Sequence, residues 1–168
     1  MKDPYIHVLK ETYCFKKLPE NDIMAIRNVC REEEFCPGDI IFSEGDRKDR
    51  CFILLEGRVE IRQEYRHTEE ESIGVCSPFQ IYAETSLFET CSGNGTALAK
   101  TPVRLLSICR EDFEKIGEKS PEIMFSVIRA ISEMIRKRSE NILRQLQTGT
   151  RYLEEICLHL QKEAEVLH

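Results

Sequence analysis

Cysteine and histidine have the widest chemistry of the residue types in this chain, because both bind metals and thiols also form disulfides. The cysteines are even in number, eight in all, at positions 14, 30, 36, 51, 76, 91, 109 and 157. No Cys-x-x-Cys pair occurs, and Cys51, Cys76 and Cys109 lie in or beside apolar runs, where a thiol acts as a small hydrophobe. The four histidines are scattered, at 7, 67, 159 and 168. We predict free thiols and no metal site, with a haem or redox sensor as a lesser alternative.

Motifs of the common enzyme classes are missing. The runs Gly-x-x-x-x-Gly-Lys-Ser/Thr, His-Glu-x-x-His and Gly-x-Ser-x-Gly do not occur. The glutamates fall in charge-rich stretches such as 69–71, which are typical of solvated loops or strand edges. No pair of acids can be singled out for catalysis. The sequence therefore predicts a protein that is not an enzyme.

The length and net charge of the chain narrow the class of protein further. The chain has 168 residues, 41% of them hydrophobic, which suits one domain with its own core. Its 24 Lys and Arg against 30 Asp and Glu give a net charge of -6, which is unlike a protein that wraps nucleic acid. No stretch approaches the ~20 apolar residues that span a bilayer. We expect a soluble, cytoplasmic protein that does not contact membranes.

The first 119 residues contain a helical segment and a segment of short strands, and these must position any site there. Residues 1–30 predict a helical lead-in, because Asp3-Pro4 supplies a cap and a first-turn proline and a second helical pattern follows Pro19. Residues 31–119 carry short apolar runs separated by turns such as Pro37-Gly38-Asp39 and Glu56-Gly57-Arg58. Strands at that density predict an antiparallel β-roll or sandwich.

A long helix is predicted for residues 120–147, because Ser120-Pro121-Glu122 supplies a cap, a first-position proline and an acid. A stripe at steps of three and four follows, as in a two-helix seam: Ile128, Ile131, Ile135, Arg138, Ile142 and Leu146. The stripe could instead pack on the chain's own roll, but the helix is longer than so small a roll needs. We therefore favour a homodimer through residues 121–146. Thr148-Gly149-Thr150 is expected to break the helix, which leaves residues 148–168 as a hinge and short helical tail.

Residues 37–46 and 51–59 together resemble the cyclic-nucleotide-binding domain of catabolite activator proteins and related sensor regulators, kinase regulatory subunits and gated channels. The two runs read Pro-Gly-Asp-Ile-Ile-Phe-Ser-Glu-Gly-Asp and Cys-Phe-Ile-Leu-Leu-Glu-Gly-Arg-Val. Gly38, Gly45 and Gly57 stand where tight turns need a positive φ or no side chain. The resemblance covers residues 15–146 and implies a mainly β fold, an antiparallel double-stranded β-helix (jelly roll) with flanking helices and a long C-terminal dimerisation helix.

The family holds its ligand in a phosphate-binding cassette that reads Phe-Gly-Glu, a short helix with Leu, and then Arg-Ser/Thr-Ala. The matching segment, called the cassette below, is residues 82–97: Tyr82-Ala83-Glu84-Thr85-Ser86-Leu87-Phe88, a loop, and Gly95-Thr96-Ala97. The resemblance implies that Glu84 accepts a hydrogen bond from a ribose 2'-hydroxyl. It also implies that amides near Thr85 and Ser86 face phosphate and that Thr96 donates to it. Arg138 and Ser139 match the stretch of the long helix that meets the nucleobase.

Two cassette positions depart from the family. Ala83 replaces the glycine, and Gly95 stands where the arginine that neutralises the cyclic phosphate belongs. A charge-assisted bond contributes ~1.5–3 kcal/mol, so its loss weakens binding on the order of ten- to a hundredfold unless another cation substitutes. Arg138 is one candidate substitute, although it could equally set the register of paired helices, and Lys100 is a weaker one. Cys91, in the same loop, has no adjacent base or cation and is predicted to be inert.

These features predict a regulatory sensor domain that binds a cyclic nucleotide, cyclic AMP or cyclic GMP, or another small anion, and signals through a homodimeric helix. The alternative is a ligand-free protein-interaction module that kept the fold, with its tail docking a partner protein. Residues 148–151 and the helix after them resemble the start of the activators' DNA-binding domain, but no recognition helix follows them. Direct DNA binding is therefore not expected, and the identity of the ligand stays open.

Overall fold

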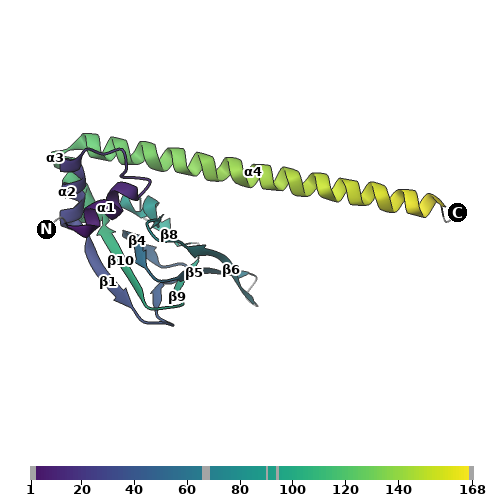
Figure 1. Cartoon of the computed structure of the whole chain (residues 1–168), viewed down its shortest axis with the longest axis horizontal. Coiled ribbons are helices and arrows are strands. Elements are labelled where there is room, and N and C mark those ends of the chain that lie inside the picture. Colours follow the sequence, from purple (N-terminus) through teal and green to yellow (C-terminus); the bar gives the residue numbers. More distant parts are fainter. Residues whose placement is uncertain (1–2, 66–68, 90, 94, 167–168) are drawn as a thin grey trace. The chain divides into compact units, whose positions relative to one another are not determined.

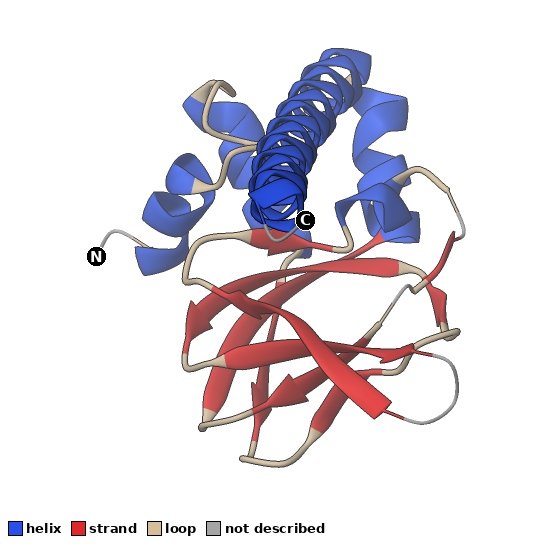
Figure 2. Ribbon diagram, turned by 90° about the vertical axis from the view of Figure 1, so that its right-hand side faces the viewer, coloured by secondary structure: helices blue, strands red, loops and turns tan. Residues whose placement is uncertain are grey.

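The structure is a computed structural model that describes residues 3–65, 69–89, 91–93 and 95–166. The described strands form two four-stranded antiparallel sheets and a two-stranded ribbon. The first sheet has the order β1 (Arg31–Phe35), β10 (Val103–Cys109), β4 (Arg50–Glu56) and β7 (Ile81–Tyr82). The second has the order β2 (Ile40–Phe42), β9 (Thr96–Ala99), β5 (Val59–Tyr65) and β6 (Glu69–Cys76). The ribbon pairs β3 (Arg47–Lys48) with β8 (Cys91–Ser92). The predicted antiparallel jelly roll is confirmed (Figure 2).

Strand β4 lies at the centre of the first sheet, and residues 51–55 along it are all buried. Phe52 and Leu54 face the interior of the roll, where they pack in a cluster with Val59, Cys76, Ala97, Ala99, Val103 and Leu105. Because side chains alternate along a strand, Cys51 and Ile53 face the opposite side of the sheet. Helices cover that side (Figure 2). Burial on both faces explains why this strand reads as an unbroken apolar run.

Glycines form three of the turns between strands, as the sequence predicted. Gly38, Gly45 and Gly57 all have positive φ. Gly57 is also held by its surroundings, because a Cβ there would lie 2.2 Å from the carbonyl oxygen of Pro102. The backbone amide of Arg58 donates to the hydroxyl of Thr101 at 2.9 Å. The turn at residue 57 and the turn at residues 101–102 therefore rest directly against each other.

In the described part of the chain, three short α-helices flank the roll (Figure 1). Helix α1 (Pro4–Glu11) begins at the predicted cap, where a carboxylate oxygen of Asp3 accepts from the amide of Tyr5, and α2 is Glu20–Val29. Helix α3 (Arg110–Lys119) lies in a stretch that the sequence prediction assigned to the roll. Its buried residues Phe113, Ile116 and Gly117 are spaced by three and one, which is a pattern too short to distinguish a helix from a loop.

Helix α4 (Pro121–Val166) is 46 residues long and crosses from one compact unit, Met1–Ile131, into a second, Ser132–His168. Within the first unit, Ile123, Val127 and Ile131 are buried at steps of four. Ile131 therefore packs on its own domain and does not belong to the exposed stripe predicted for a dimer seam. Within the second unit, Ile135, Ile142 and Leu146 are exposed. The packing alternative thus holds for Ile131, and pairing through the exposed residues stays a prediction.

The break expected at Thr148-Gly149-Thr150 is absent, because α4 continues through these residues to Val166. The hydroxyl of Thr148 donates to the carbonyl of Arg144 at 2.9 Å, and that of Thr150 donates to the carbonyl of Leu146 at 3.0 Å. Both hydroxyls are thus bonded along the helix itself. A glycine costs a helix only about 1 kcal/mol, which is too little to end one that has helical residues on both sides. The predicted hinge was therefore wrong. Among the residues that the structure describes, no helix is long and apolar enough to cross a membrane.

Candidate functional site

The cassette connects β7 to β9 and begins with a left-handed residue. Ala83 has φ 54° and ψ 35°, although alanine disfavours this region by about 1–2 kcal/mol. A short 3-10 helix, η1 (Glu84–Leu87), follows immediately. Ala83 therefore adopts a conformation that glycine takes readily, at the position that the resemblance matches to the glycine of the family. The surrounding structure, not the residue type, fixes the left-handed turn.

Glu84 lies inside the protein, with only 7% of its surface exposed. Burial raises the pKa of the Cys51 thiol on β4 well above its ordinary value, and η1, which carries Glu84, packs against that strand. Ser86 is buried and Thr85 is half-buried. Glu84, Thr85 and Ser86 all make interactions within the chain. Glu84 is therefore fixed in the cassette instead of pointing into solvent.

The backbone amides at the start of η1 differ from the expectation. The amide of Ser86 donates to the carbonyl of Ala83 at 3.0 Å, which closes a turn. It is therefore engaged within the cassette and does not face an anion in this structure. The role predicted for the amide near Thr85 stays a prediction.

Arg110, the first residue of α3, ties the cassette to the roll. Its Nε donates to the carbonyl of Ser86 at 2.6 Å, and its Nη2 donates to the carbonyls of Glu89 at 2.5 Å and Lys48 at 3.1 Å. Three carbonyls from two stretches of chain, residues 86–89 and residue 48, therefore meet on one guanidinium, whose fork of donors suits this geometry. Sequence reasoning missed this residue, because it belongs to the helix that was not predicted.

The second part of the cassette is packed tightly against β5. Gly95 is buried, and a Cβ there would lie 2.7 Å from the carbonyl oxygen of Arg62 and 3.1 Å from Cγ2 of Ile61. The hydroxyl of Thr96 accepts from the amide of Glu44 at 2.9 Å, and Ala97 is fully buried. Gly95 thus stands where the backbone of β5 leaves no room for a side chain. This close packing explains why residue 95 is a glycine, whereas its match to the arginine of the family stays a prediction.

An apolar cavity of about 20 Å³ lies inside the roll, and both ends of the cassette contribute to its wall through Tyr82 and Ala97. The other lining residues come from β2, β4, β5, β6 and β10: Ile41, Phe42, Phe52, Leu54, Val59, Ile61, Cys76 and Leu105. A cavity of this size holds about one water molecule and excludes a nucleotide.

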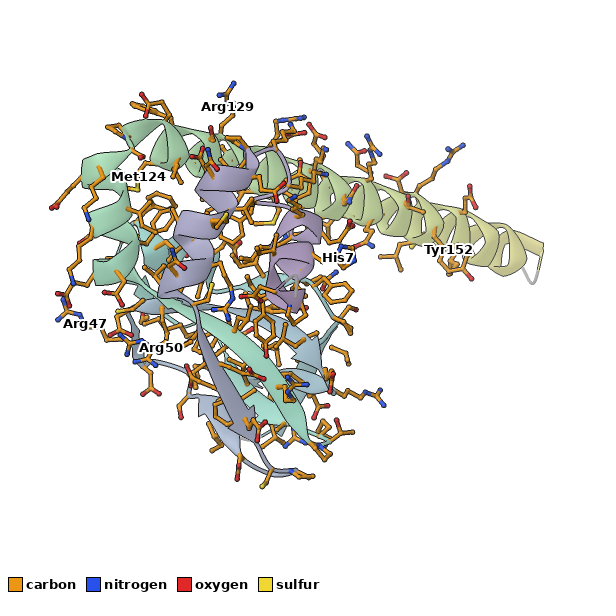
Figure 3. All side chains as sticks on the ribbon, turned by 60° about the vertical axis from the view of Figure 1, so that its left-hand side comes forward. His7, Arg47, Arg50, Met124, Arg129 and Tyr152 are labelled. Carbon is orange, nitrogen blue, oxygen red and sulfur yellow. The ribbon has the colours of Figure 1, made fainter. Side chains whose placement is uncertain are left out.

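Several cations lie around the second sheet and the ribbon. Arg62 and Lys100 both pair with the carboxylate of Glu60, at 3.0 Å and 3.2 Å. Lys48 lies elsewhere, in β3, next to Arg47 (labelled in Figure 3). Its Nζ is 3.6 Å from the centre of the Phe42 ring. The sequence offered no signal for Lys48, because it stands in a charged run, residues 46–50, that reads as a solvated turn.

The remaining predicted ligand contacts, Arg138 and Ser139, belong to the second compact unit, where both are exposed. Their assignment to the nucleobase stays a prediction. Of the eight cysteines, the seven whose side chains are described are free thiols, and the side chain of Cys91 lies outside the described part. Burial raises the pKa of Cys30 to about 12. No three His, Cys, Asp or Glu residues gather as metal ligands in the described part of the chain, where His7 lies on α1 (Figure 3).

Comparison with known proteins agrees with this geometry. A "CRP-like cAMP-activated global transcriptional regulator" of Mycobacterium tuberculosis is 24% identical over 135 residues, which are 80% of this chain and 60% of the regulator. The chain thus spans well under two thirds of that relative. The N-terminal domain of a transcriptional regulator from Streptomyces coelicolor superposes with a TM-score of 0.73 at 27% identity, over 80% of this chain and 94% of the other. The regulatory domain of Toxoplasma gondii PKA, solved with cAMP, has the same fold, with a TM-score of 0.62 at 20% identity over 69% of this chain and 46% of the other.

The sequence pattern of the cyclic nucleotide-binding domain matches residues 32–120, which are more than half of the chain. This range includes both sheets, the cassette and α3. With the jelly roll, the buried glutamate and the left-handed turn at Ala83 in place, the match assigns the family: the chain belongs to the cyclic nucleotide-binding domain family.

Proposed function

We propose that this chain is a regulatory domain whose cassette binds a cyclic nucleotide, cyclic AMP or cyclic GMP, or another small anion. The observation that carries the proposal is the intact cassette start, where Ala83 keeps the left-handed turn and Glu84 is buried behind it. Relatives on the same fold are described as activated by cAMP or solved with it. Thr96 supports the proposal, because its hydroxyl accepts from Glu44 and can still donate a proton to phosphate.

Calorimetric titration with cyclic AMP and cyclic GMP tests this proposal. We expect measurable binding by the wild type and its loss in Glu84→Gln, which keeps the shape of the side chain but removes the charge that accepts from a ribose hydroxyl. Glu89→Gln, an exposed position two residues after the end of η1, is the matched control and should bind as the wild type does. No heat from the wild type at millimolar nucleotide would defeat the cyclic-nucleotide assignment.

We further propose that the domain signals as a homodimer through α4 and carries out no catalysis of its own. The exposed residues Ile135, Ile142 and Leu146 support pairing, because a stripe at heptad-like spacing suits a partner helix. Sedimentation should show a dimer for the wild type and a monomer for Ile142→Asp combined with Leu146→Asp. Arg144→Asp, on the opposite face of the helix, is the control and should remain dimeric. A wild-type monomer at high micromolar concentration would exclude this pairing.

A second candidate function is a protein-interaction module that binds no ligand. The packing of Gly95 against the carbonyl of Arg62 favours it, because the phosphate arginine of the family cannot be accommodated there. The exposed Tyr152, Leu153 and Ile156 would then form the surface for a partner protein (Tyr152 in Figure 3). Under this alternative, Glu84→Gln leaves partner binding unchanged, and polar replacement of Leu153 and Ile156 abolishes it.

A haem or redox sensor is the lesser alternative, and an absorption spectrum of the purified protein tests it.

We propose that the domain acts in the cytoplasm, where thiols such as Cys14 and Cys51 stay reduced. The net charge of -6 argues for a signal passed to a protein and against direct contact with DNA.

A further inference from the structure

We propose that Lys48 supplies the positive charge for the ligand's phosphate that the cassette lacks at Gly95. The inference rests on the proposed function and names a residue that comes from outside the cassette. A phosphate needs a cation or several oriented donors at short range, and a lysine ammonium provides a compact charge with three donors.

The backbone places Lys48 against the cassette loop. Strand β3 pairs with β8, and Lys48 lies opposite Cys91 in the ladder. The amide of Gly45 donates to the carbonyl of Gly93 at 3.0 Å, and the amide of Gly93 donates to the carbonyl of Asp46 at 3.2 Å. The turn at residues 43–48 is therefore hydrogen-bonded to the loop along its length. This pairing fixes the position from which the lysine side chain starts.

The side chain then runs directly over the loop. A Cβ on Gly93 would lie 2.1 Å from Nζ of Lys48 and 2.2 Å from its Cε, so the absence of a side chain at Gly93 makes room for the ammonium. The same Nζ is 3.6 Å from the centre of the Phe42 ring. Phe42 lines the apolar cavity, together with Tyr82 and Ala97 from the two ends of the cassette. The ammonium thus lies between the cassette loop and the wall of this cavity.

The phosphate hydroxyl predicted by the resemblance lies against the same turn. Thr96 accepts from the amide of Glu44, four residues before Lys48. One turn, residues 43–48, therefore contacts the cassette at Thr96 through Glu44 and at Gly93 through Gly45, Asp46 and Lys48. A donor hydroxyl and a cation beside one turn are the two groups that the family places on its phosphate.

Three cations of the first compact unit are held by other groups. Lys100 and Arg62 both pair with Glu60, and the guanidinium of Arg110 donates to three carbonyls. Arg138 belongs to the second compact unit. Lys48 also has interactions within the chain, and its three donors allow it to take a phosphate oxygen in addition to them.

Titration with cyclic AMP and cyclic GMP tests the inference on the full chain in two ways. Lys48→Met removes the charge and keeps the apolar stem, and we expect a ten- to hundredfold weaker affinity, on the order of one charge-assisted bond. Gly93→Ala keeps the lysine but drives its ammonium away from the loop, and we expect a weakening in the same direction. Lys100→Met removes an equal charge at the Glu60 pair and should leave the affinity within about twofold, since it is a surface pair.

The outcomes separate the inference from the function on which it rests. A wild type that binds neither nucleotide overturns both. A wild type that binds, with Lys48→Met and Gly93→Ala binding equally well, overturns the role of Lys48 and leaves the proposed function standing. Thermal unfolding of each variant shows whether it is folded, and if Lys48→Met fails to fold, Gly93→Ala decides the question alone.

Discussion

Restoring the family's arginine at Gly95 should damage this protein instead of improving its affinity. The intuitive repair of the cassette is Gly95→Arg, because the resemblance places the phosphate arginine of the family at this position. The structure predicts the opposite result, since the obstacle is the first atom of any side chain. Gly95→Ala should therefore show most of the same loss of stability.

The magnitude follows from two contacts. A Cβ at residue 95 would lie 2.7 Å from the carbonyl oxygen of Arg62 and 3.1 Å from Cγ2 of Ile61. The Arg62 carbonyl belongs to β5, which is paired with both β6 and β9, so it cannot move without disturbing two ladders. Overpacking of this kind costs about 1–3 kcal/mol. In a chain of this size that lowers the unfolding temperature by about 2–10 °C.

Thermal unfolding followed by circular dichroism measures the effect, and titration with cyclic AMP measures affinity. Gly74→Ala is the matched control, because a Cβ at Gly74 meets nothing within 4 Å. Its unfolding temperature should stay the same or rise slightly. If Gly95→Arg unfolds at the wild-type temperature and binds cyclic AMP more tightly, the account of the missing arginine given above is refuted.

Three further predictions address the supports of the site. In a denaturant titration, Arg110→Met should lower the free energy of unfolding by about 2–4 kcal/mol, because three carbonyl bonds to a cation are lost. Arg31→Met, which breaks one exposed ion pair, should lower it by less than about 1 kcal/mol. Gly149→Ala should stabilise α4 by about 1 kcal/mol, visible as a higher midpoint in thermal unfolding, and an unchanged or lower midpoint would restore the predicted hinge. Cys30 should resist alkylation at pH 8 and react only as the pH rises toward about 12, because burial raises its pKa; mass spectrometry that finds it modified as fast as the exposed Cys36 would contradict its burial.

The sequence predicted the roll because its turns and its core follow local rules. Gly38, Gly45 and Gly57 mark turns with positive φ, and β4 reads as a buried apolar run. Helix α3 escaped prediction because it follows β10 without a separating turn, with Cys109 ending the strand and capping the helix without a side-chain hydrogen bond. The predicted hinge failed because one glycine costs a helix only about 1 kcal/mol, and helical residues continue on both sides of Gly149.

The order of the cassette along the chain was predictable, but its supports were not. Glu84 and Thr96 could be placed by resemblance, because they lie within one short motif. Arg110 and Lys48 reach the cassette from segments distant in sequence, so no spacing rule connects them to it. Residue 95 is a glycine because the backbone of β5 lies close to it, and this contact follows only from the pairing of β5 with β9.

The contact between the turns at Gly57 and Pro102 limits how this domain can change by mutation. Any side chain at residue 57 would force the carbonyl of Pro102 out of place, since the intruding atom would lie 2.2 Å from it. At Gly45 the space around an added Cβ is open within 4 Å, and asparagine tolerates the same backbone geometry. If both codons are randomised, functional clones should thus keep glycine at residue 57 but accept other residues at residue 45. Natural descendants of the chain should carry the same asymmetry.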